Sequence, residues 1–180
     1  MLHGHTAIYG GSFDPPHMGH QLACLYVLEA LAAEAVWLMP CFVHPFGKAL
    51  SSFEHRFAMC EKLARPLPRV TVSAAEQQLG GSGRTYDLLQ HLQATHPAKK
   101  FALVIGADML QERDAWYRFD DIEKMLPLVV VGRGGYNGGS VALPQVSSTD
   151  IRERLKRGAS VEGLVPAAVA DYVATHGLYA

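Results

Sequence analysis

The stretch GGSFDPPHMGH, residues 10–20, decides the expected fold and most of the expected chemistry. The short apolar run Thr6–Tyr9 before it predicts a buried first strand, and the apolar pattern of residues 17–33 after it predicts a helix. Glycine lets the backbone approach a ligand closely, and a helix N-terminus offers free N–H groups to an anion. His17 and His20 are one helical turn apart, so both imidazoles should face the same ligand. This order of strand, glycine turn, histidines and helix favours a phosphate-binding site.

A metal site is the main alternative interpretation of this stretch. His17, His20 and Cys24 are spaced so that they could be three ligands on one helix face. Gly19 and the turn at residues 14–16 have no role in such a site, and no fourth ligand is evident, so we expect no metal held by the protein here. The stretch also lacks the lysine of a Walker loop and the G-x-G-x-x-G spacing of a dinucleotide-cofactor fold.

Composition and charge narrow the class of protein. A chain of 180 residues, 49% of them hydrophobic, predicts one domain over residues 1–180, with a helical C-terminal portion at about 147–180. The net charge of −1 gives no general attraction to nucleic acid or to a membrane surface. The sequence does not give the oligomeric state, and a homo-oligomer is possible. Three cysteines without C-x-x-C spacing, and an N-terminus unlike a signal peptide, favour the cytoplasm.

Apolar runs alternate with helical patterns along the chain. Strands are predicted at residues 6–9, 35–39, 70–73, 101–105 and 128–131. Helices are predicted at 17–33, from a Ser51–Glu54 capping box through Leu63, at 85–96, at 147–157, and between Pro166 and Gly177. Strands that are apolar throughout are buried on both faces, and strands separated by helices form a parallel sheet. We therefore expect a doubly wound α/β fold that binds its ligands at the carboxyl ends of the strands.

A second anion site is predicted at the start of the 147–157 helix. Ser147, Ser148 and Thr149 supply hydroxyls there, and Arg152 adds a guanidinium one turn further on. The alternative is an ordinary helix cap with a solvated arginine. The presence of the first phosphate stretch in the same chain favours the anion site.

Other candidate residues follow the predicted strands. Lys48 lies in the loop at residues 41–50, Gly106 and Asp108 follow the 101–105 strand, and Arg133 follows the 128–131 strand. Asp108 either binds ribose hydroxyls or caps a helix. Lys48 and Arg133 either bind phosphate or are surface charges. Trp116 is either a stacking platform or a core residue. No nucleophile–base pair or carboxylate cluster stands out. The residues favour a reaction that positions two phosphates without covalent catalysis.

With these residues the chain resembles the bacterial nicotinate-mononucleotide adenylyltransferases nearly end to end. GGSFDPPHMGH resembles the first nucleotide-binding motif of the family, and SSFEHRFAMCEKLA resembles its second helix. FALVIGADML, AWYRF, LVVVGRGGY, SSTDIRERLKRG and the terminal LVPAAVADYVATHGLY are similar to its later segments. The H-x-G-H element alone marks the wider nucleotidyltransferase superfamily, whereas its combination with SSTDIR and HGLY is much more specific.

The resemblance implies a Rossmann-like nucleotidyltransferase fold and transfer of AMP from ATP to nicotinate mononucleotide, a step of NAD biosynthesis. It implies that His17, His20, Lys48 and Arg152 are catalytic and that Mg²⁺ arrives mainly on the ATP phosphates. The ATP-binding residues that it implies are Gly10, Gly11, Ser12, Phe13, Gly106, Asp108, Ser147, Ser148 and Thr149. The acceptor-binding residues would be Arg84, Thr85, Trp116 and Arg133.

Three departures from the family pattern fall on the acceptor side. HPFGK stands where the family has PPHK, GRT stands where it has SYT, and the segment at Arg133 has Gly-Gly after the arginine. Arg84 thereby replaces an aromatic residue near the expected pyridine pocket. The alternatives are adenylyl or cytidylyl transfer to another phosphomonoester, such as nicotinamide mononucleotide, or a nucleotide-binding module without turnover.

Overall fold

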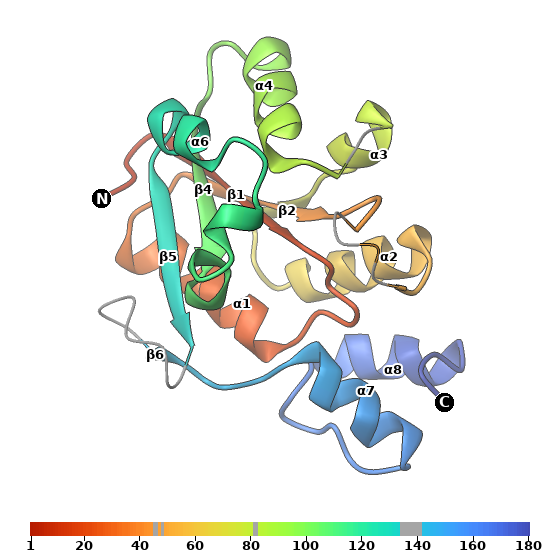
Figure 1. Cartoon of the computed structure of the whole chain (residues 1–180). Helices are drawn as coiled ribbons and strands as arrows, with labels where there is room; N and C mark the ends of the chain where they lie inside the picture. Colours follow the sequence, from red (N-terminus) through yellow and green to blue (C-terminus); the bar gives the residue numbers. More distant parts are fainter. Residues whose placement is uncertain (45–46, 48, 81–82, 134–141) are drawn as a thin grey trace.

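The computed structural model describes residues 1–180 except 45–46, 48, 81–82 and 134–141, and it leaves out the side chains of Asp108, Arg133 and Ala142. The described strands form one parallel sheet in the order β3-β2-β1-β4-β5-β6 (Figure 1). Their bounds are β1 His5–Gly11, β2 Ala35–Pro40, β3 Val70–Val72, β4 Lys100–Gly106, β5 Leu128–Arg133 and β6 Ala142–Leu143. This order confirms the doubly wound α/β fold that the alternating pattern predicts.

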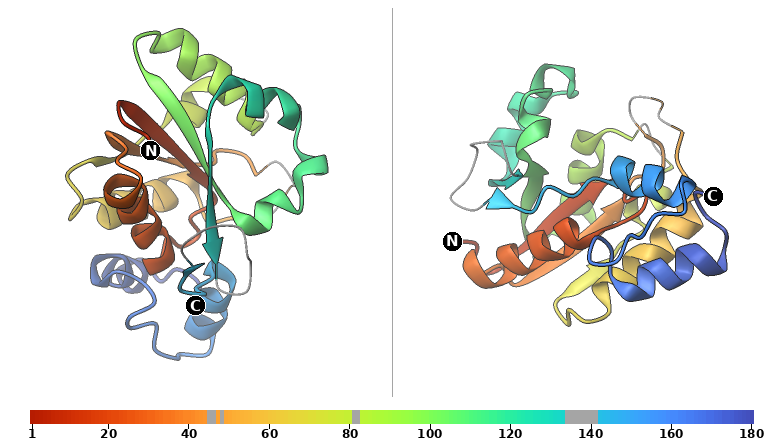
Figure 2. Two further views of the ribbon diagram at one scale, coloured as in Figure 1. Left: turned by 90° about the vertical axis from the view of Figure 1, so that its left-hand side faces the viewer. Right: turned by 90° about the horizontal axis from the view of Figure 1, so that it is seen from below.

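Helices cover both faces of the sheet. They are α1 Met18–Leu25, which continues as a π-helix over Tyr26–Ala30, then α2 Phe53–Ala64, α3 Ala75–Leu79, α4 Thr85–Thr95, α5 Ala107–Leu110, a 3₁₀ turn at Arg113–Ala115, α6 Phe119–Met125, α7 Ser148–Lys156 and α8 Ala167–Thr175. Helices α4 and α6 lie above the sheet in Figure 1, and the view from below in Figure 2 shows α1, α2, α7 and α8 on the other side.

The two faces have separate hydrophobic cores because successive residues of a strand point to opposite sides. In β1, Ala7 and Tyr9 belong to the core under α1, α2 and α8, whereas Ile8 belongs to the core under α4 and α6. Ile151 of α7 and Val169 of α8 join the first of these cores. The continuous apolar run of the first strand is thus explained by burial on both sides.

The structure corrects several boundaries. The helix predicted at 17–33 ends as a π-helix at Ala30, and Ala32 then takes a left-handed conformation with φ 57°. Helix α2 is capped by Ser52, whose hydroxyl accepts from the backbone of His55, so the predicted Ser51 cap was wrong. The short elements α3, α5, α6 and β6 were not predicted, since elements of two to seven residues carry little periodic signal.

The predicted glycine turn is also displaced. Gly10 and Gly11 are the last residues of β1, and neither has a positive φ. The chain turns two residues later, where Phe13 takes a left-handed conformation with φ 49°. The turn itself, which we call the 12–17 turn, therefore begins beyond the glycines.

Candidate active site

The carboxyl ends of the central strands meet at one edge of the sheet. Gly11 pairs with Pro40 at the end of β2, and Gly106 pairs with Val131 near the end of β5. The chain leaves β1 toward β2 and β3, and later returns to the other side of β1 with β4. The strand order therefore reverses between β1 and β4, which is where such sheets bind ligands.

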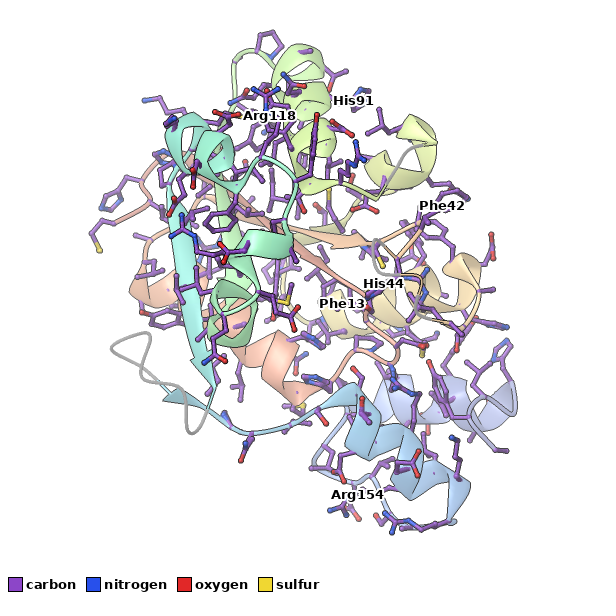
Figure 3. The ribbon with its side chains drawn as sticks, in the orientation of Figure 1. Phe13, Phe42, His44, His91, Arg118 and Arg154 are labelled. Carbon is purple, nitrogen blue, oxygen red and sulfur yellow. The ribbon has the colours of Figure 1, made fainter. Side chains whose placement is uncertain are left out.

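His17 and His20 lie at this edge, at the start of α1. His17 is the N-cap residue and is 2% exposed; its backbone N–H donates to Nδ1 of His20 at 3.1 Å. The two imidazoles stack with their centroids 3.7 Å apart, and the ring of Phe13 packs edge-on against His20 at 4.8 Å. Figure 3 shows Phe13 just beyond the end of β1. The two imidazoles thus lie together at the start of α1, as their spacing predicted, and their binding of a common ligand stays a prediction.

Two glycines make room for these rings. A Cβ atom at Gly19 would lie 3.1 Å from Cε1 and Nδ1 of His17, and one at Gly11 would lie 3.2 Å from the ring of Phe13. Both separations are shorter than an ordinary van der Waals contact. The glycine at position 19 is therefore explained by the imidazole that folds over it, a reason that spacing alone does not reveal.

The start of α7 is joined to the 12–17 turn across more than 130 residues of sequence. The hydroxyl of Ser148 donates to the carbonyl of Pro15 at 2.9 Å, and Nη1 of Arg152 donates to the carbonyl of Asp14 at 2.6 Å. Arg152 also donates to Oγ1 of Thr149, while Ser147 caps the helix by accepting from Asp150. The two stretches that the sequence assigned to phosphate thus lie together.

Sequence reasoning missed two residues that anchor the same turn. Asp14, 3% exposed, accepts at Oδ2 from the backbone N–H of Ser51 at 3.3 Å and at Oδ1 from the hydroxyl of Tyr179 at 2.6 Å. The signal was present as an acidic residue inside the GGSFDPPHMGH stretch and a tyrosine in the terminal HGLY. It was not used because no spacing rule connects residues 165 positions apart.

Arg56 is a third missed residue. It is 2% exposed, and its guanidinium donates to the carbonyls of Ser51 at 2.9 Å and Ser12 at 3.0 Å. It therefore joins the segment before α2 to the 12–17 turn. The available signal was its position three residues after Phe53, on the apolar face of the helix. An arginine on that face is buried and therefore needs hydrogen-bond partners.

The loop after β2 is fixed at its start by the backbone of Phe42, which donates to Oε2 of Glu76 at 2.8 Å. Burial raises the pKa of Glu76, and this hydrogen bond opposes that shift. Phe42 also packs edge-on against Phe53, with 5.4 Å between their centroids. Lys48, predicted to be catalytic in this loop, lies outside the described residues.

Two of the predicted acceptor residues, Arg84 and Thr85, lie at the start of α4, close to the start of α6. Arg84, which precedes Thr85 at the start of α4, lies over the ring of Tyr117 at 4.3 Å. Arg118, labelled in Figure 3 between the two helices, lies over the ring of Tyr86 at 4.2 Å. The two helix starts thus exchange arginine–tyrosine contacts. Among the described residues, Arg84 forms no ion pair with a carboxylate.

Trp116 takes the core position, one of the two roles that the sequence left open, and its role as a stacking platform stays a prediction. Its ring packs edge-on against Phe119 at 5.7 Å and joins the core under α4 and α6. Its indole N–H is buried and has no hydrogen-bond acceptor in the described part of the chain. A buried donor without an acceptor is costly, so this group suits a ligand oxygen.

Two further predicted residues are only partly described. Asp108 lies in α5 and Arg133 ends β5, but their side chains are outside the described structure. Gly106 helps to line a small cavity of about 10 Å³ with Tyr9 and Gly19. Larger grooves, of about 510 and 560 Å³, flank the edge strand β3 and include none of the predicted site residues.

The described ranges hold neither a cluster of metal ligands nor a helix suited to cross a membrane. No three histidine, cysteine or acidic side chains gather there as a metal site would require, and Cys24 is buried. None of the described helices combines the length and the apolar character that a membrane crossing requires.

Comparison with known proteins decides the family. A family model described as cytidylyltransferase-like matches residues 8–154. A protein of Anaeromyxobacter dehalogenans named "Probable nicotinate-nucleotide adenylyltransferase" is 47% identical over 178 residues, which cover 96% of this chain and 95% of that one. A protein of the same name from Myxococcus xanthus is 44% identical, covering 97% and 94%. The chain belongs to the nicotinate-nucleotide adenylyltransferase family.

Solved structures agree with this family membership at the level of the fold. The nicotinic acid mononucleotide adenylyltransferase of Plasmodium falciparum, solved in complex with NaAD, superposes with a TM-score of 0.84 at 20% identity and covers 98% of both chains. The Rossmann-like nucleotidyltransferase fold implied by the sequence resemblance is thereby confirmed.

Proposed function

We propose that this protein transfers AMP from ATP to nicotinate mononucleotide, giving nicotinate adenine dinucleotide and pyrophosphate. One observation carries the proposal: the stacked histidines of α1 and the Ser148–Arg152 start of α7 meet on one turn at the switch point of the sheet. Two helix N-termini, two imidazoles and a guanidinium suit the negative charge of a triphosphate. Family membership supports the same activity.

In the proposed reaction, an oxygen of the acceptor's own phosphate attacks the α-phosphorus of ATP. The bond from that phosphorus to the bridging oxygen of the β-phosphate breaks, and pyrophosphate leaves with the electron pair. No group of the protein forms a covalent bond. His17 and His20 stabilise the charge at the α-phosphorus, and Arg152 with Ser148 binds the outer phosphates, so catalysis consists of positioning and charge stabilisation.

We propose that Mg²⁺ reaches the site on the ATP phosphates. Both carboxylate oxygens of Asp14 accept hydrogen bonds from the protein, so they are engaged before any ion arrives. Carried on the ATP phosphates, Mg²⁺ would neutralise charge that develops on the leaving pyrophosphate.

The acceptor side is where this chain differs from its family, and two observations support a carboxylated pyridine there. The guanidinium of Arg84 is exposed, stacked on Tyr117 and without a carboxylate partner in the described residues. The buried indole N–H of Trp116, the residue directly before Tyr117, offers a second hydrogen-bond donor. A cation and a donor favour the acid over the neutral amide.

The test is pyrophosphate release from ATP and Mg²⁺ with nicotinate mononucleotide and nicotinamide mononucleotide offered in parallel. We expect kcat/KM to favour the nicotinate form, and Arg84→Tyr, which restores the family's aromatic residue, to reduce that preference. A higher kcat/KM with nicotinamide mononucleotide would identify that amide, and not the nicotinate form, as the preferred acceptor. Binding of ATP without pyrophosphate release from any acceptor would indicate a binding module.

A further inference from the structure

The carboxylate of Asp14 is a buried charge inside the 12–17 turn. Three segments distant in sequence donate hydrogen bonds to this one residue: Ser51 and Tyr179 to its carboxylate, and Arg152 to its carbonyl. A buried carboxylate is tolerated only when its oxygens are satisfied, so these donors hold the turn in one place. Of the two donors to the carboxylate, Tyr179 makes the shorter contact, at 2.6 Å, against 3.3 Å for Ser51.

Tyr179 is itself held in a defined geometry. It takes a left-handed conformation with φ 65°, and the backbone of Leu178 before it donates to the carbonyl of Val173 in α8 at 3.0 Å. Burial and, after it, the hydrogen bond to Asp14 raise the pKa of the Tyr179 phenol above its usual range. The phenol therefore keeps its proton, and Tyr179 remains the donor to a carboxylate acceptor.

We propose that Tyr179 is a positioning residue for the 12–17 turn and acts through the carboxylate of Asp14. Asp14 is three residues from His17, and the two prolines between them restrict the backbone, so a displacement at Asp14 is passed on to the imidazole. The inference rests on the proposed function only in that the turn binds ATP. It assigns a functional role to the HGLY segment, which the reaction itself does not use.

The first test compares two tyrosine variants. Tyr179→Phe removes only the hydroxyl that reaches Asp14. Tyr172→Phe is the matched control, because Tyr172 lies on α8, and its hydroxyl lies 3.0 Å from Nδ1 of His55, away from the turn. We expect Tyr179→Phe to lower kcat and the affinity for a non-hydrolysable ATP analogue about tenfold each, with the acceptor KM within about twofold of wild type.

Tyr172→Phe should leave kcat and analogue affinity within about twofold of wild type, while both variants lose similar thermal stability. Equal kcat and analogue affinity in the two variants would overturn the proposal. Calorimetric binding of the analogue requires no acceptor, so it tests the role of Tyr179 even if nicotinate mononucleotide is not the substrate. Wild-type protein that does not bind the analogue would also overturn the proposal.

A double-mutant cycle tests the route through Asp14. Asp14→Asn removes the charge that makes the Tyr179 hydrogen bond strong. If Tyr179 acts through Asp14, adding Tyr179→Phe to Asp14→Asn should lower analogue affinity by less than about threefold. A full additional tenfold loss would show that Tyr179 acts independently of Asp14 and would refute this route.

Discussion

Replacing Gly19 by alanine should separate stability from activity. The added Cβ would lie 3.1 Å from two ring atoms of His17, against 3.4–4 Å for an ordinary contact, so the imidazole must move by a few tenths of an ångström. It cannot move freely, because it is buried and stacked on His20 at 3.7 Å. A misplacement of about 1 Å in a catalytic group costs on the order of 100-fold, so a smaller shift should lower kcat about tenfold.

The same substitution should leave the fold nearly unchanged. Gly19 lies in α1 without a positive φ, and alanine is favoured over glycine in a helix by about 0.5–1 kcal/mol. This gain offsets much of the strain at His17. We expect the urea midpoint to stay close to wild type while pyrophosphate release falls. A variant with kcat within twofold of wild type would refute the argument that His17 must occupy this position.

Three further predictions concern separate parts of the molecule. Trp116→Phe removes the buried indole N–H and should raise the acceptor KM about tenfold with little change in the ATP KM; equal changes in steady-state kinetics would mark Trp116 as a core residue only. Arg56→Met leaves two carbonyls without their donor and should lower the free energy of unfolding by about 2 kcal/mol in urea titrations, whereas an unchanged midpoint would contradict this role. Burial raises the pKa of Cys24 from 9.0 to about 12, so the native state keeps the thiol protonated, and stability should decline as pH rises above 9. Between pH 8 and pH 10, Cys24→Ala should lose about 1.4 kcal/mol less unfolding free energy than wild type, and parallel losses would argue against the shift.

Much of the fold followed from the sequence because its signals are local. The five longer strands are apolar runs between helical patterns, and that alternation alone predicts a parallel sheet. The stacked histidine pair was also accessible, since three-residue spacing at a helix start fixes a common face. The short helices α3, α5 and α6 were missed because their packing against neighbours, rather than their own periodicity, stabilises them.

The supports of the site were not predictable in this way. Asp14, Arg56 and Tyr179 act through hydrogen bonds to residues between 5 and 165 positions away, and nothing in the local pattern identifies those partners. The sequence also could not show that Gly11 stays in the strand or that Phe13 makes the turn. Phe13 takes a left-handed conformation and packs against Tyr9 and His20, contacts that local propensity does not predict.

The hydrogen bonds from α7 to the 12–17 turn span 133 and 138 residues of sequence, a separation that bears on the order of folding. Contacts of such separation form late, because much of the intervening chain must be ordered before they can close. A partly folded chain that already has β1 and α1 would display the histidines without the guanidinium that completes the phosphate site. Nucleotide affinity should therefore appear only with the finished tertiary structure, so that folding intermediates do not sequester ATP.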